Sequence, residues 1–97
     1  MIDFNSLNAH TSKLIYISGV PHINVHVHYV DEKTVTYYAM DIKYIDHSPV
    51  IESCLGFEPD EQLQILALVD QKRELFFSIA KEQGIIRVNS EEELLAY

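Results

Sequence analysis

The stretch HINVHVHYV, residues 22–30, alternates between apolar and polar side chains with a period of two. The apolar positions are Ile23, Val25, Val27 and Tyr29, and the polar positions are His22, Asn24, His26 and His28. This period predicts a β-strand with one face against a core and the other toward solvent or a partner. Because a shift of one residue would exchange the two faces, the segment restricts how its neighbours can pair with it.

Turn residues divide the first half of the chain into three segments rich in β-branched and aromatic side chains. These are KLIYIS (13–18), residues 22–30 and VTYYAMDIKYI (35–45), and they are separated by Gly19 to Pro21 and by residues 31–34. Such segments bounded by turn residues predict three strands in an antiparallel meander.

The second loop predicts a pairing register. If residues 31–34 form a tight hairpin, Val27 lies opposite Tyr38 and Val25 lies opposite Met40. The more apolar faces of the two strands then coincide, as burial on one side requires.

The same register predicts neighbours on the polar face. His28 lies opposite Tyr37, His26 lies opposite Ala39, and Asp41 is placed diagonally across from His26. The histidines and these two residues of the next strand are therefore expected to share one surface.

The second half of the chain carries residues that typically begin and end helices. HSPVIESCLG (47–56) predicts a short helix, with Ser48 as N-cap, Pro49 at the first position and Gly56 at the end. Residues 59–83 carry apolar side chains at helical spacing after an acidic start. This apolar stripe is wider than one small sheet face needs. Either the helix breaks near Asp70 into two helices that pack on each other, or part of it is buried against a second copy in a homodimer.

The two ends predict smaller elements. Residues 85–88 form a short apolar segment that predicts a fourth strand, and Asn89 or Ser90 can cap a helical turn after it. The N-terminal FNSLNAHTS (4–12) predicts another short turn. The chain is thus expected to be a single α+β domain, 1–97, with a three-stranded meander and helices packed on one face.

Charge and cysteine content limit the class of function. The chain has 15 acidic and 7 basic residues, for a net charge of −8. Nucleic-acid binding depends on basic residues, so this balance argues against it and favours a basic protein partner. We expect no membrane segment and a cytoplasmic location, because apolar runs are short and no signal-peptide pattern is present. Cys54 is the single cysteine, and we expect it to be buried.

The histidine row has two interpretations. We expect His22, His26, His28, Tyr37 and Asp41 to form a binding surface. The alternative is a metal site in which His26 and His28, about 7 Å apart on one strand, bind an ion together with Asp41. Histidines with an ordinary pKa near 6.5 would also gain charge in mild acid, which would weaken an interface that they line.

Motifs for catalysis or cofactor binding are absent from the sequence, which has no GxSxG, GxGxxG, phosphate loop or HExxH. A third hypothesis is a small-molecule pocket between sheet and helix, lined by Met40, Tyr38, Phe76 and Phe77. The leading hypothesis is a non-enzymatic protein-interaction module without a cofactor, which engages a cationic partner. In size and charge the chain resembles small acidic inhibitor, immunity and accessory proteins, a general likeness that assigns no residue a role.

Overall fold

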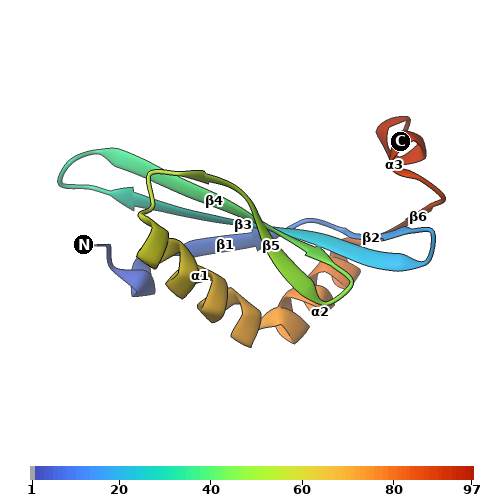
Figure 1. Cartoon of the computed structure of the whole chain (residues 1–97), viewed down its shortest axis with the longest axis horizontal. Helices are drawn as coiled ribbons and strands as arrows, with labels where there is room; N and C mark the ends of the chain where they lie inside the picture. The colour runs from blue at the N-terminus through green and yellow to red at the C-terminus, as the bar shows by residue number, and fades with distance from the viewer. Residues whose placement is uncertain (1) are drawn as a thin grey trace.

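A computed structural model describes residues 2–97 and shows an α+β fold, in which three helices pack against a six-stranded mixed sheet (Figure 1). A short 3-10 helix at Phe4–Ser6 precedes the sheet. The strands are β1 (Asn8–Thr11), β2 (Leu14–Ile17), β3 (Val20–Asp31), β4 (Thr36–Ile45), β5 (Ser48–Leu55) and β6 (Ile85–Val88). The helices are α1 (Pro59–Gln71), α2 (Arg73–Gln83) and α3 (Glu91–Leu95).

The long strand β3 organises the sheet. It pairs with β4 along one side, while β1 and β2 share its other side, and the main strand order is β5-β4-β3-β2-β6. All pairs are antiparallel except β2 with β6, which is parallel. The expected antiparallel succession of three strands is present as β2, β3 and β4. The three-strand description was too small, because β1, β5 and β6 extend the sheet.

One face of the sheet carries the core, as the alternation in residues 22–30 predicted. The helices α1 and α2 cover this face, as Figure 1 shows. The buried side chains of this core from β3 and β4 are Ile23, Val25, Val27, Met40, Ile42 and Tyr44. From the helices they are Ile65, Val69, Phe76 and Ala80. Burial of this apolar surface is the main stabilising contribution to such a fold.

The pairing of β3 with β4 differs from the predicted register by two residues. His26 lies directly opposite Asp41, and Val27 lies opposite Met40. The turn occupies residues 32–35 and not 31–34, because Val35 takes a left-handed conformation with φ 53°. A β-branched residue is rarely found there, so sequence reasoning had placed it in the strand. A shift of two preserves both faces but changes every cross-strand neighbour.

The helix predicted over residues 47–56 is wrong, since this segment forms strand β5. The chain reverses in a two-residue turn at Asp46 and His47, with Asp46 at φ 59°. Aspartate tolerates this left-handed conformation, which suits short hairpins. The Ser48 and Pro49 pair that resembled a helix start is instead the first part of an edge strand, where proline is tolerated.

The long helical segment consists of two helices that meet at Lys72, whose φ and ψ are −108° and 17°. The break lies two residues beyond Asp70, near the expected position, but the two helices follow one another beneath the sheet and do not pack side by side (Figure 1). Near it the hydroxyl of Tyr44 donates to Asp70 Oδ1 at 3.0 Å, which joins β4 to the end of α1. Tyr44 is fully buried, and this burial together with the hydrogen bond raises the pKa of its phenol above the ordinary value.

The C-terminal elements β6 and α3 form where the sequence predicted them, and the Ser90 side chain caps α3 by accepting from the Glu93 N–H. The expectation that all helices share one face is wrong for α3, which stands over the opposite face (Figure 1). At this end that face carries the apolar Ile15 and Ile17, which line one groove together with Leu94 of α3. The position of α3 is explained by the apolar surface of β2, which would be exposed to water without it.

Two further expectations concern membrane and thiol chemistry. Within residues 2–97, no helix is both long and apolar enough to cross a membrane. Cys54, expected to be buried, is exposed, because the segment that carries it is an edge strand and not a packed helix. Its thiol lies 3.7 Å from the carbonyl oxygen of Phe57.

Candidate binding surface

The open face is the face of the sheet opposite α1 and α2. Among the described residues, α3 is the one helix that stands over it, and it does so at one end. Because direct partners across a ladder share a face, the pairing fixes its members. The open face includes Asn8 and His10 of β1, His22, Asn24, His26, His28 and Val30 of β3, Tyr37, Ala39, Asp41 and Lys43 of β4, and Ser53 and Leu55 of β5. Toward α3 it continues through the apolar Ile15 of β2, Ile45 of β4 and Val50 of β5.

A hydrogen-bonded network crosses three strands at the centre of the open face. His26 Nδ1 lies 2.8 Å from Asp41 Oδ1, and the Ser53 hydroxyl donates to Asp41 Oδ2, also at 2.8 Å. The Tyr37 hydroxyl lies 3.4 Å from His26 Nε2. The network therefore runs from β5 through β4 to β3 and returns to β4.

The network determines the protonation of its members. The hydrogen bond from His26 lowers the pKa of the Asp41 carboxyl; partial burial opposes this, and the Ser53 hydroxyl adds to the lowering. An ionised carboxylate only accepts, so His26 carries its proton on Nδ1 and, when neutral, offers Nε2 as the acceptor for Tyr37. The side chains of His26 and Asp41 are 38% and 34% exposed, so both can also reach a partner.

Aromatic rings form a second group beside the network. His10 stacks on His28 with ring centroids 5.3 Å apart and an interplanar angle of 17°. Tyr37 lies on the other side of His28 at 6.2 Å, and the His26 ring is 5.8 Å from that of His28. Ala39, directly opposite His28, has a side chain too small to obstruct Tyr37. The rings of His10, His28 and Tyr37 thus form a stacked row that crosses β1, β3 and β4.

The structure brings four of the five predicted surface residues together. His26, His28, Tyr37 and Asp41 lie in contact, whereas His22 lies apart at the end near α3. His22 Nδ1 is 2.8 Å from the carbonyl oxygen of Val20, a local hydrogen bond. Tyr38, which the alternation assigned to the core side, lies there with its ring tilted against those of Tyr29 and Phe57.

Two residues of this surface were missed by sequence reasoning. His10 belongs to the four-residue strand β1, where a polar residue at every second position from Asn8 to Ser12 was the available signal. Ser53 was assigned to a helix, so its meeting with Asp41 could not be expected. Both depend on which strands neighbour β3 and β4, which alternation alone does not specify.

The geometry bears on the other two interpretations. Within residues 2–97, no three His, Cys, Asp or Glu side chains converge on a point that could hold a metal ion. Metal binding by His26, His28 and Asp41 stays a prediction, and Asp41 in this structure contacts His26 itself. The four side chains of the small-molecule hypothesis lie in or against the core. Met40 is fully buried in the core cluster with Phe76, and Tyr38 and Phe77 pack against that cluster.

What the open face can do chemically follows from its composition. It offers an ionised carboxylate, imidazoles that donate and accept, and a phenol, beside partly exposed apolar side chains. Val30, Tyr37 and Leu55 are about half exposed, at 47%, 48% and 59%. A mixture of aromatic anchors and polar edges is typical of protein-contact surfaces. Comparisons of the chain with protein-family models, curated proteins and solved structures found no match.

Proposed function

We propose that the protein is a small acidic interaction module, of the inhibitor, immunity or accessory type, which binds a basic protein through the open face of its sheet. The observation that carries this proposal is the uncovered sheet face with the His26, Asp41, Ser53 and Tyr37 network at its centre. The role is non-enzymatic, since these side chains lie on an open face and not in a closed pocket.

Charge supports a cationic partner. The net charge is −8, and the ion pairs formed among residues 2–97 are few: His26 with Asp41, His47 with Asp46, and Arg73 with Asp70. Most carboxylates are therefore available to attract a basic surface and accelerate association. The preformed hydrogen bonds of Asp41 and His26 reduce the entropic cost of binding, because these side chains are already ordered.

The test is affinity capture from the native host with the wild-type chain and with the double variant His26→Ala, Tyr37→Ala. A matched control is Gln71→Ala, Gln83→Ala, an exposed and uncharged pair on α1 and α2 outside the open face. We expect a stoichiometric basic protein with the wild type and the control, and its loss with the open-face variant. Binding should weaken as salt rises, because exposed charges are screened.

Absence of a stoichiometric partner at low and moderate salt, or equal capture by the open-face variant, would contradict the proposal.

A further inference from the structure

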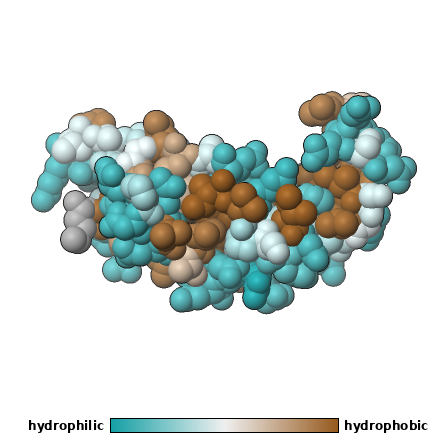
Figure 2. Space-filling model, viewed as in Figure 1, coloured by the Kyte–Doolittle hydropathy of each residue, from teal (hydrophilic) through white to brown (hydrophobic). Residues whose placement is uncertain are grey.

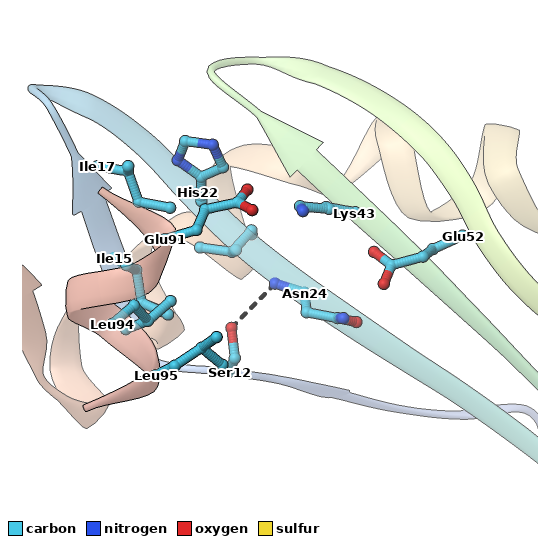
Figure 3. Close-up of a pocket in the computed structure, with 11 residues that line it drawn as sticks. Ser12, Ile15, Ile17, His22, Asn24, Lys43, Glu52, Glu91, Leu94 and Leu95 are labelled. Carbon is cyan, nitrogen blue, oxygen red and sulfur yellow. Dashed lines mark hydrogen bonds between the residues drawn. The ribbon is translucent and has the colours of Figure 1, made fainter. Parts of the chain in front are cut away.

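A groove separates α3 from the open face of the sheet, and it has an apolar side and a polar side (Figure 3). Its volume is about 320 Å³. Ile15 and Ile17 of β2 and Leu94 and Leu95 of α3 form the apolar side. Figure 2 shows the molecule hollowed beside the raised C-terminal helix. A groove of this size is sufficient for one extended side chain or a small ligand.

Two carboxylates lie at the polar side of the groove. Glu91 comes from the first turn of α3, and Glu52 comes from β5 at the point where its pairing with β4 is irregular. In Figure 3 the two head groups point toward the groove from opposite sides, with the Lys43 ammonium between them. Neither carboxylate forms an ion pair within 4.0 Å among residues 2–97.

Asn24, which also lines the groove, has a side-chain oxygen that lacks a hydrogen bond. The Oδ1 atom of Asn24 is shielded from solvent and has no partner, although the backbone N–H of Asn24 donates to the Ser12 hydroxyl at 2.9 Å. Because this oxygen is shielded, the two carboxylates are the acceptors that the groove offers to a ligand entering from solvent. The groove therefore combines an aliphatic wall with acceptors that are ready for a donor.

We propose that this groove receives an arginine side chain of the partner protein. The methylene stem would pack against Ile15 and Leu94, as long basic side chains pack along apolar surface. The planar guanidinium has five N–H donors, enough to bind the carboxylates of Glu52 and Glu91 together. This inference rests on the proposed function, because it identifies the group by which a basic partner is held.

Lys43 is the competitor in this arrangement. It lies between the two carboxylates and supplies a positive charge that an incoming guanidinium must displace. Substitution of Lys43 by methionine keeps the aliphatic stem and removes the charge. The proposal therefore predicts opposite effects, with weaker binding when a carboxylate is neutralised and stronger binding when Lys43 is neutralised.

The experiment is an NMR titration of the full chain with Nα-acetyl-arginine amide, and with Nα-acetyl-citrulline amide as the neutral isostere. We expect amide shifts confined to residues 15–17, 24 and 91–95, with citrulline binding at least about threefold more weakly. Glu52→Gln and Glu91→Gln should each weaken arginine binding about threefold, and Lys43→Met should strengthen it by a similar factor. Glu92→Gln, a neighbour on α3 outside the groove, is the matched control.

Equal binding of arginine and citrulline, shifts elsewhere on the surface, or no binding up to the solubility limit would overturn the inference. The amide spectrum of each variant shows directly whether it is folded. The proposed function fails separately, because its test uses His26 and Tyr37, which are outside the groove. A partner that is lost with the open-face variant but unaffected by Glu52→Gln and Glu91→Gln would contradict the arginine site in the groove and leave the proposed function standing.

Discussion

The imidazole of His26 donates its Nδ1 proton to the carboxylate of Asp41, which lies directly opposite it on the next strand, at 2.8 Å. This pair is the centre of the open face and links its polar residues to the register of the sheet. A change of two residues in that register would separate the two groups, so the candidate surface depends on the turn at residues 32–35.

Asp41→Asn should destabilise the fold by about 0.5–1 kcal/mol at pH 7, a modest loss because the pair is partly exposed. The folded pKa of Asp41 lies below its usual value, so its contribution is present above about pH 4 and is lost as pH falls through the folded pKa. Urea unfolding at pH 7 and pH 3 measures this. If the stability difference between wild type and variant is equal at both pH values, this prediction is contradicted. Ser53→Ala is the comparison variant, because it removes the hydrogen bond from Ser53 to Asp41 and keeps the one from His26.

Tyr44→Phe should cost about 1 kcal/mol at pH 7, because it removes the hydrogen bond to Asp70 from a buried phenol. Burial raises the pKa of Tyr44, so the unfolded chain, with a tyrosine pKa near 10, loses this proton first as pH rises. Wild-type stability should therefore fall above about pH 10 more steeply than that of the variant. Denaturant unfolding between pH 7 and pH 10.5 checks this, and Tyr97→Phe, at an exposed site, should behave as wild type.

Gly56→Ala should destabilise the fold more than Gly19→Ala. Both glycines have left-handed φ values, +88° and +83°, so each substitution costs about 1 kcal/mol of backbone strain. A Cβ at Gly56 would also lie 2.9 Å from the Tyr38 ring, while one at Gly19 would meet nothing within 4 Å. Thermal unfolding should show an excess loss of about 1–2 kcal/mol at Gly56. Equal losses at the two sites would show that the Tyr38 ring moves aside freely.

Protein purified without a histidine tag should contain no stoichiometric zinc, copper, nickel or iron. The reason is that Asp41, the proposed third ligand, is held by His26 and Ser53 in the structure. Elemental analysis gives the answer directly. One bound metal per chain that disappears in both His26→Ala and His28→Ala would instead favour the metal-binding alternative.

We expect light scattering to give twice the mass of the chain, because the helices keep exposed apolar side chains that can pair with a second copy. Leu63 of α1 and Leu75 of α2 are 66% and 55% exposed, which supports this homodimer prediction. The double variant Leu63→Glu, Leu75→Glu should then be monomeric. A monomer for the wild type at about 100 μM would contradict the prediction, since this concentration is about 100-fold above a micromolar Kd.

A feature of this fold is predictable from the sequence when the residues that determine it lie close together along the chain. The alternation in residues 22–30 correctly separated Val25 and Val27 from His26 and His28, because burial of one face is a local property of a strand. The register failed by two residues, because Val35 adopts a conformation that β-branched residues rarely take. The sequence therefore predicted which residues of β3 and β4 lie on the open face, but it did not predict which of them contact one another.

The missed strand β5 has a different cause. Ser48, Pro49 and Gly56 satisfy the rules for a helix, and the same residues suit an edge strand after a two-residue turn. The choice between them was made by pairing with β4, a tertiary interaction that short-range signals do not contain. The break near Asp70 was foreseen as one of two alternatives, since too many apolar residues were present for a single helix face.

The parallel pairing of β2 with β6 joins residues 14–17 to residues 85–88, among the most distant contacts in the chain. During synthesis the outer edge of β2 therefore stays without a partner until almost every other element has left the ribosome. Contacts of this separation form late and slowly, and an unpaired strand edge can capture the same edge of another nascent chain. Prematurely terminated chains that end before Ile85 should consequently be the species most prone to aggregate and most dependent on chaperones.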